Sequence, residues 1–397
     1  MKQITRSLQK AIKNAMWVRY LAATIVAFLL LSLLRFITFN MDAFNPIARG
    51  LKGFSTTDIF YDMMLASPAD TSDVIVIVDI TQLHDRDSIA TALEEIDALE
   101  PAAIDVDVVF EYPKEPVGDM HLVSVAATLS NAVFSFKMMD PDRERKEFTR
   151  QAHSFFAEDL GIKEGFVNVD RSMVRDIPLC LKMQGKNYPS VTACMMEVLQ
   201  GKPFDFQQQQ KMPIDYTPTV FRVIPYDSIQ HYAQYITGHV VMFGGAYESI
   251  DMVYTPLGQM HGIKVLCYAI KTMLEKRQQI DCTGWLYWLL TFLFSYLSVC
   301  CILSYRRWLR AKSHLLQETR KKGITHWLKS LTIDILNTTF FVSVVIFFLM
   351  DTSVFIDYIF FHAWSIHFDL TPTLSVMALT LISADFVNII IKYSHIK

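Results

Sequence analysis

Aspartates are the residues in this chain whose type and spacing could do chemistry, and they recur where strands are expected to end. The acidic candidates are Asp79, Asp105, Asp107, Asp119 and Asp251. Asp105 and Asp107 are two residues apart, so in a strand they share one face. Burying two carboxylates on a core face is costly unless they are paired, hydrogen-bonded or bound to a cation. They can cap helices or pair with Arg86 or Arg175, line a polar ligand pocket, or bind a hard cation, and the sequence leaves all three open.

The stretch 239–275 offers a second set of candidates. They are Gly244, Gly245, Asp251, Thr255 and His261. An apolar run ends at Gly244 and, after a polar loop, a helical pattern opens at His261, which is typical of a buried strand, a turn and a helix. Ligands of open α/β sheets bind beyond the carboxyl end of such a strand. The glycines would let a ligand approach the backbone, whereas a satisfied histidine at a helix start is the simpler interpretation of His261.

No catalytic or cofactor motif accompanies these residues. The chain contains no GxGxxG, GKS, GKT, HExxH or GxSxG sequence. The cysteine spacings match no metal signature. We therefore expect no enzyme activity, no cofactor and no bound metal, and an Asp-dependent hydrolase acting outside the membrane is the weakest alternative. Cys180 and Cys194 are the pair to examine for a disulfide, with free buried thiols as the simpler interpretation.

The elements that must position these residues alternate between strand and helix patterns. Strands are predicted at 73–80, 102–110, 132–136, 165–169, 220–224 and 240–243, and helices at 55–65, 88–99, 121–129, 190–199, 227–235 and 261–275. The charge run 140–147 is interpreted as a solvated loop, and 202–218 as an irregular surface segment. The β-branched run 74–78 indicates a central strand covered on both faces. The pattern predicts an α/β domain with a mixed, mainly parallel sheet and helices on both faces.

Four apolar segments predict a four-helix transmembrane region. They cover residues 16–37, 284–304, 330–350 and 371–391. The chain is 52% hydrophobic and 19% charged, as is typical of membrane proteins. The apolar run 20–34 within the first segment is short for a transmembrane helix, but no small-x-small cleavage site follows it, so we expect an uncleaved anchor rather than a signal peptide.

Basic residues give the orientation of these helices. The N-terminal segment 1–15 and the loop 305–329 are rich in Lys and Arg, whereas the loop 351–370 contains neither. By the positive-inside rule the loop 305–329, the N-terminus and the tail 392–397 are cytoplasmic. Residues 38–283 then form a domain outside the membrane, with 34 acidic against 21 basic side chains. That charge argues against a nucleic-acid partner.

Polar residues within the predicted transmembrane helices form two pairs with i, i+3 spacing. The pairs are Asp334 with Asn337 and Asp385 with Asn388. In antiparallel helices the two pairs would lie at similar depth. Because intramembrane polar groups need partners, we hypothesise that they join the two helices or bind a partner's helix. The alternative is that Asp334 and Asn388 lie among lipid headgroups and have no special role.

An ordered set of short motifs runs through residues 55–275. They are Thr57-Asp58, Val78-Asp79-Ile80, the segment 102–110 with Asp119 downstream, the segment 165–170, Val174-Arg175, Pro178-Leu179, Tyr188-Pro189-Ser190, Phe243-Gly244, Asp251, Thr255-Pro256 and His261-Gly262. In this order they resemble the second type of CHASE domain, an extracytoplasmic sensory module of bacterial cyclases and histidine kinases. The resemblance extends to one transmembrane helix before the domain and three after it. It implies the sensing of a ligand and no catalysis.

Two departures from the family pattern stand out. The loop after the first strand keeps Arg86 but lacks the tryptophan and proline that often precede it, and Ser172 stands where a turn glycine is common. Residues 392–397 alone follow the last predicted transmembrane helix. We therefore expect a stand-alone form without a cyclase or kinase output domain.

These observations predict a sensor of the bacterial inner membrane with a large periplasmic domain. We expect it to bind an unknown small ligand or a periplasmic protein and to pass a signal through its transmembrane bundle to a separate output or envelope protein. Its other expected partner is the lipid bilayer, and the sequence leaves open whether the protein forms a homodimer. The alternative function is a structural subunit of a bacterial envelope complex with no ligand.

Overall fold

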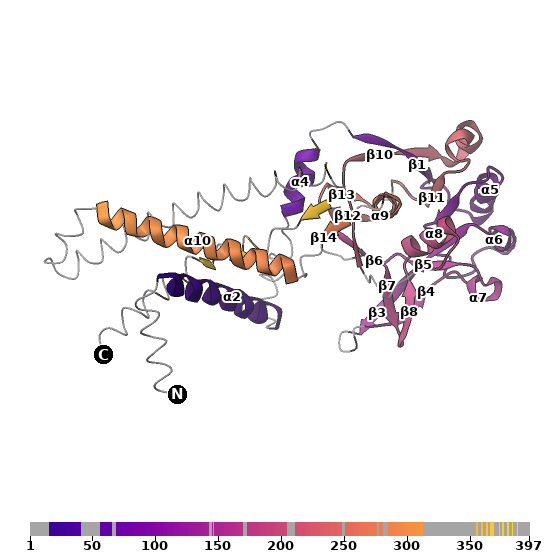
Figure 1. Cartoon of the computed structure of the whole chain (residues 1–397). Coiled ribbons are helices and arrows are strands. Elements are labelled where there is room, and N and C mark those ends of the chain that lie inside the picture. The colour runs from indigo at the N-terminus through magenta and orange to yellow at the C-terminus, as the bar shows by residue number, and fades with distance from the viewer. Residues whose placement is uncertain are drawn as a thin grey trace. The chain divides into compact units, whose positions relative to one another are not determined.

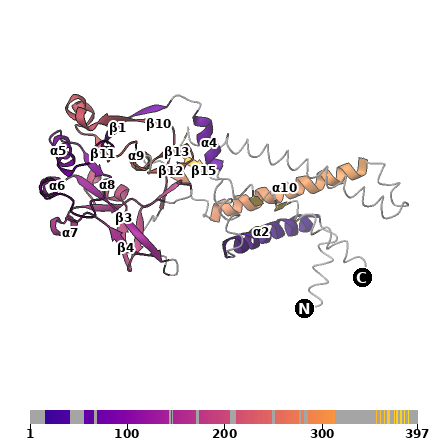
Figure 2. The ribbon, with the colours of Figure 1, turned by 180° about the vertical axis from the view of Figure 1, so that it is seen from behind.

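The computed structural model describes two compact units. One comprises Tyr61–Gln278, and the other comprises Met1–Phe60 with Gln279–Lys397. The residues described are 16–40, 56–65, 69–142, 145, 147–169, 173–204, 211–247, 251–275, 278–280 and 285–312, with scattered positions between 355 and 387. Figure 1 and Figure 2 show their helices and strands from opposite sides. The predicted α/β domain falls in the Tyr61–Gln278 unit.

The described residues of this unit form a nine-stranded sheet with the order β10-β1-β11-β2-β3-β4-β7-β8, in which β5 also pairs with β3. The strands are β1 (Asp70–Asp79), β2 (Ala103–Val106), β3 (Ala132–Asp142), β4 (Glu147–Ala152), β5 (Glu164–Phe166), β7 (Cys180–Met183), β8 (Lys186–Pro189), β10 (Thr219–Pro225) and β11 (Val240–Gly244). All pairs from β10 to β3, and β3 with β5, are parallel, whereas β3–β4 and β7–β8 are antiparallel. The sheet is therefore mixed and mainly parallel, as predicted.

Two smaller two-stranded sheets accompany this sheet, and the second of them is a hairpin. One pairs β6 (Asp176–Pro178) with β9 (Lys211–Pro213), and the other pairs β12 (Met252–Thr255) with β13 (Gly258–His261). Both are antiparallel. The second hairpin leads directly into helix α9 (Gly262–Leu274).

Helices cover both faces of the parallel strands. One core is built from alternate residues of the strands, such as Val78 and Phe243, and from apolar residues of three helices. These helices are α5 (Arg86–Asp97), α6 (Pro116–Thr128) and η2 (Tyr226–Tyr235). On the other face, α8 (Val191–Gln200) contacts β2, β3 and β5, and α9 contacts β11 and α8 (Figure 1). Because strand side chains alternate, Ile77, Met242 and Asp105 point to this second face.

Local sequence explains where two of these helices begin. Asp85 caps α5, because its side chain accepts a hydrogen bond from Ser88 N at 2.7 Å. Ser190 caps α8 in the same way through Ala193 N at 3.2 Å. The start of α8 packs directly on β5: a Cβ on Gly165 would lie 2.7 Å from the carbonyl carbon of Ser190. Only glycine permits this close approach of helix and strand.

Several predicted elements differ from the structure. The second strand ends at Val106 rather than Phe110, so Asp107 lies just beyond it. The charge run 140–147 is predicted as a loop, but residues 140–142 belong to β3 and Glu147 begins β4, and Arg150 pairs with Asp140 across these strands at 3.1 Å. The polar loop after Gly245 contains the β12–β13 hairpin. In addition, β11 is inserted between β1 and β2, so the first two strands of the chain are not neighbours.

The other unit contains α2 (Met16–Asn40) and α10 (Trp285–Lys312). In the described part of the chain one helix is long and apolar enough to cross a membrane, Tyr287–Tyr305, and Trp17–Leu33 is a shorter apolar helix. The two helices pack through aromatic pairs: the ring centroids of Phe28 and Trp288 are 6.3 Å apart. The predicted helix 330–350 and most of 371–391 lie outside the described residues, as do Asp334, Asn337, Asp385 and Asn388. The four-helix region therefore stays a prediction.

Candidate functional site

Asp79 ties together the loops at the carboxyl ends of β1 and β11. Its Oδ1 accepts hydrogen bonds from Thr81 N at 3.1 Å, Thr81 Oγ1 at 2.5 Å and Ala246 N at 2.8 Å. Thr81 Oγ1 in turn accepts a bond from Tyr247 N at 3.2 Å. Asp79 pairs with Gly244 in the sheet register, so this cluster lies where the two strands end. We call the ends of β1, β11 and β2, with the loops that follow them, the carboxyl edge.

Gly244 brings the first turn of α9 down onto the carboxyl edge. A Cβ at this position would lie 2.9 Å from Ile263 Cδ1 and 3.0 Å from Asp107 Cβ. Asp107 itself is held beside β11, because its N–H donates to Phe243 O at 2.9 Å. Any larger side chain at Gly244 would push α9 or the end of β2 away.

Asp251 lies over the start of α9. Gly262 N donates to Asp251 O at 2.9 Å, and a Cβ on Gly262 would lie 3.0 Å from Asp251 Cγ. A carboxylate at a helix N-terminus is favoured by the helix dipole. His261 precedes this turn, and its ring packs edge-on against Tyr247, with centroids 6.2 Å apart. Tyr247 is 60% exposed, so the carboxyl edge presents an aromatic ring to solvent.

Arg86 and Asp119 form a buried ion pair between the first turns of α5 and α6. Asp119 also accepts hydrogen bonds from Lys114 N at 2.8 Å and Glu115 N at 2.9 Å. Burial pushes the pKa of Asp119 upward, but the bonds from Arg86 and the two amides outweigh it and hold the pKa below its ordinary value. The guanidinium also donates to Tyr112 O. These two residues therefore fix the loop between β2 and α6.

Asp105 lies two residues before Asp107 and points to the same face of the sheet. In register it stands between Met242 of β11 and Val133 of β3, and it is fully buried. Burial raises the pKa of Asp105 well above its ordinary value, and the nearby charge of Asp107 adds to the shift. Burial raises the pKa of Cys267 on α9 and of Cys194 on α8, and the charge of Asp105 adds to both shifts.

Thr255 and Arg175 lie apart from the carboxyl edge. Thr255 forms the turn of the β12–β13 hairpin, donating to Gly258 O at 2.8 Å and accepting from Leu257 N at 3.2 Å. Arg175 follows Val174, whose N–H donates to Tyr254 O at 2.8 Å, and Arg175 O accepts from Ile214 N at 2.8 Å. Thr255 lies at the far end of the hairpin, about 10 Å along the strands from His261, and Arg175 follows a residue bonded to Tyr254 beside that end.

The structure thus brings six predicted residues together at one edge of the sheet. They are Asp79, Asp107, Gly244, Gly245, Asp251 and His261. A family model described as the CHASE2 domain matches residues 21–303, more than two thirds of the chain. The chain belongs to the CHASE2 family. Comparison with curated proteins and with solved structures gave no match. CHASE2 domains are extracytoplasmic sensory domains, which agrees with the resemblance found in the sequence.

The match spans the complete Tyr61–Gln278 unit of this CHASE2 domain. Within the described residues no group of three or more His, Cys, Asp or Glu side chains is arranged to hold a metal ion. Cys180 and Cys194 are both free thiols.

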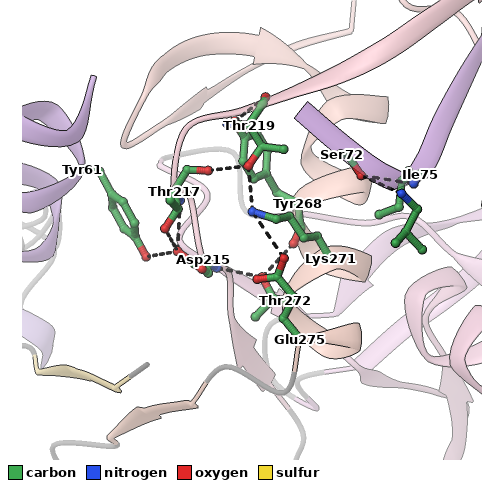
Figure 3. A network of polar contacts seen from close by, with 11 residues as sticks. Tyr61, Ser72, Ile75, Asp215, Thr217, Thr219, Tyr268, Lys271, Thr272 and Glu275 are labelled. Atoms are coloured by element: carbon green, nitrogen blue, oxygen red, sulfur yellow. Dashed lines mark hydrogen bonds and ion pairs between the residues drawn. The ribbon is translucent and has the colours of Figure 1, made fainter. Parts of the chain in front are cut away.

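A second polar network of the CHASE2 domain surrounds the last turns of α9 (Figure 3). Asp215, a buried residue, accepts hydrogen bonds from Thr217 Oγ1 at 2.7 Å and from Tyr61 Oη at 3.4 Å. Its own N–H donates to Thr272 Oγ1 at 2.9 Å. Tyr61 belongs to α4 (Thr56–Met64), the helix that follows α2 along the chain. Asp215 therefore joins α4 and α9.

Two further α9 residues in Figure 3 bind the start of β10. Tyr268 Oη donates to Thr219 O at 3.2 Å and accepts from Thr219 N at 3.1 Å. Lys271 Nζ donates to Thr219 Oγ1 at 2.7 Å and lies 3.6 Å from Glu275 Oε1. α9 is thus held by its first turn at the carboxyl edge and by its last turns at the Asp215 network.

Sequence reasoning missed Thr81, Tyr247, Cys267 and the Asp215 network. Thr81 had a local signal, because a threonine two residues after an aspartate often forms a side-chain turn. Asp215 and Thr217 repeat the same spacing. Cys267 and Tyr268 had no signal beyond the helical period, since their neighbours Asp105 and Thr219 lie far away in the sequence.

Proposed function

We propose that this CHASE2 domain is the ligand-binding part of a membrane-anchored sensor, and that the carboxyl edge is where it binds. The supporting observation is that α9 begins at this edge, with Asp251 over its first turn and Gly244 beneath it. Binding sites of open α/β sheets occur at such an edge. The occupant would be a small polar ligand or a segment of a periplasmic protein, and the domain would have no catalytic role.

We propose further that α9 carries the signal toward the membrane. α9 ends at Leu274, and α10 begins only a short segment later, at Trp285. A ligand that shifts Asp251 or His261 would move the first turn of α9, and a packed helix transmits such a shift as a rigid body. The transmembrane bundle would pass this state to a separate output protein, with both termini in the cytoplasm and the domain in the periplasm.

The test uses the full chain in lipid nanodiscs, incubated with size-fractionated periplasmic extract. We expect one small-molecule fraction to raise the unfolding temperature, because a ligand that binds the folded state stabilises it. Tyr247→Ala and His261→Ala should lose this stabilisation, since both remove rings at the carboxyl edge. The proposed site would be rejected if both variants kept the full stabilisation, or if no fraction raised the unfolding temperature.

A structural role in an envelope complex remains a second candidate because of one surface feature. Tyr112, Val117 and Met120 are 65%, 72% and 68% exposed and lie within nine residues of one another. Exposed apolar clusters often mark protein interfaces. In this case affinity purification from native membranes should recover a stoichiometric partner, and Val117→Asp should release it. The two surfaces are controls for each other: Val117→Asp should leave ligand stabilisation intact, and Tyr247→Ala should leave co-purification intact.

A further inference from the structure

The buried carboxyl group of Asp105 has an environment that does not suit a negative charge. Its side chain has 0% exposure, and neither carboxylate oxygen has a hydrogen-bond partner among the described residues. Its neighbours in the sheet, Met242 and Val133, are apolar. Buried polar groups are nearly always hydrogen-bonded, and an unpaired buried charge is among the costliest groups a fold can contain.

The groups facing Asp105 offer little compensation for a charge. Within the described residues no Lys, Arg or His forms an ion pair with it. The ionisable groups that interact with Asp105 are Asp107, just beyond its strand, Cys267 on α9 and Cys194 on α8. Lys264 lies near Cys267, and Glu197 and Lys163 lie near Cys194. Burial raises the pKa of Cys194 to about 12 and that of Cys267 well above its ordinary value, so both thiols stay neutral. Asp107, the group beside it on the same face, is another carboxyl and opposes ionisation of Asp105.

We propose that Asp105 is a proton-binding site and that loss of its proton loosens α9 from the sheet. The neutral acid fits the apolar row between Met242 and Val133, whereas the carboxylate needs water or a rearrangement of what covers it. α8 and α9 cover this face, and the charge of Asp105 acts on Cys267 of α9. Because α9 leads along the chain to α10, the protonation state of Asp105 would reach the membrane by the same helix as a ligand. The proposal does not depend on the carboxyl edge, and its test needs no ligand.

The direction of the pH dependence follows from linkage. The pKa of Asp105 in the folded domain lies above the ordinary value of 3.8. The group therefore contributes its full stabilisation below that ordinary value, and the contribution is lost as the pH rises toward the raised pKa. A lower pH therefore favours the closed position of α9, and a higher pH loosens it. Asp105→Asn has nearly the same shape and is neutral at every pH, so it should keep α9 closed throughout.

Cys267 is a built-in reporter of this opening, because its thiol is buried between α9 and the sheet. The full chain in nanodiscs is treated with N-ethylmaleimide, and alkylation of each cysteine is followed by mass spectrometry. At about pH 8 we expect Cys267 to react at least tenfold faster in the wild type than in Asp105→Asn, and at about pH 5 the two rates should agree. Comparing the two proteins at one pH removes the general pH dependence of thiol alkylation. Beyond the effect of burial, the charge of Asp105 raises the pKa of Cys267, which alone would slow the reaction in the wild type, so a faster reaction there reports opening. Cys180, a half-buried thiol outside α9, is the internal reference and should react equally in both.

Equal Cys267 rates in the two proteins at both pH values would overturn the proposal, as would a faster reaction in Asp105→Asn. A second measurement needs no variant and covers the case in which Asp105→Asn fails to fold. Hydrogen exchange of α9 in the wild type, corrected for intrinsic rates, should speed up about tenfold across the same range, whereas α5 should not change. The same change in both helices would also overturn the proposal.

Discussion

Asp105 and Asp119 are two buried aspartates of the same domain with opposite surroundings. Asp119 receives the Arg86 guanidinium and two backbone amides, and its pKa lies below the ordinary value. Asp105 has no hydrogen-bond partner among the described residues, and its pKa lies well above the ordinary value. Asp119 lies on the side of the sheet covered by α5 and α6, and Asp105 lies on the side covered by α8 and α9. The difference shows that partners, and not burial alone, decide whether a buried carboxyl is a fixed anchor or a group whose charge can change.

The largest expected effect comes from breaking the satisfied pair. Arg86→Met leaves the Asp119 charge buried with two amides only, and we expect the free energy of unfolding to fall by about 3–5 kcal/mol. Chemical denaturation of the full chain in detergent measures it. Arg150→Met is the matched control: it removes an exposed ion pair with Asp140 and should cost less than about 1 kcal/mol. Similar losses in both variants would show that the Arg86–Asp119 pair has no special stabilising role.

The next effect tests how tightly α9 closes over the side of the sheet that holds Asp105. Gly244→Val forces its side chain into Ile263 and the Asp107 Cβ, and we expect a loss of about 1–3 kcal/mol. Gly244→Ala should lose less, because it adds one methyl group. A Gly244→Val protein with wild-type stability and unchanged Cys267 protection would mean that α9 does not press on β11 as described.

The pH profiles of the two aspartates should run in opposite directions. Asp119, with its lowered pKa, stabilises the fold above its ordinary pKa and loses this contribution as the pH falls through the lowered value. Asp105 loses its contribution as the pH rises, by about 1.4 kcal/mol for each unit between its ordinary and folded pKa. Asp105→Asn should therefore gain stability relative to the wild type at neutral pH, and Asp119→Asn should lose it. Thermal unfolding of both variants from acid to neutral pH checks this, and parallel curves would refute the contrast.

The smallest effect concerns the link between the two strand ends. Thr81→Val removes the hydroxyl that bonds Asp79 and Tyr247 N, and we expect a loss of about 1 kcal/mol with the fold intact. Thr81→Ser keeps the hydroxyl and should behave like the wild type in the same denaturation experiment. A Ser variant as unstable as the Val variant would assign the loss to the methyl group instead.

Local patterns in the sequence predicted much of the fold. The β-branched run of β1 and the period of α5 each predicted the right element, and the motif order indicated the CHASE2 family. The β3–β4 hairpin was missed because its strands carry charges, which exposed strands tolerate as cross-strand pairs. The position of β11 between β1 and β2 could not be predicted, since strand order depends on contacts between distant segments.

The candidate site was predictable in part for the same reason. Asp79, Gly244 and Asp251 lie where strands end, and the structure brings them to one edge. The roles of Arg86 and Asp119 followed only once α5 and α6 were placed side by side. Asp105 has no hydrogen-bond partner among the described residues because of all the elements packed around it, and no local pattern in the sequence carries that information.

The central claim is that α9 moves when the CHASE2 domain binds its ligand or when Asp105 changes its charge, while the side of the domain that holds the Arg86–Asp119 pair stays fixed. Hydrogen exchange of the full chain in nanodiscs, with and without the stabilising periplasmic fraction, tests it most directly. The account predicts slower exchange in α9 and the β12–β13 hairpin, with α5 and α6 unchanged. Slower exchange confined to the segment around Val117, or equal in all helices, would contradict it.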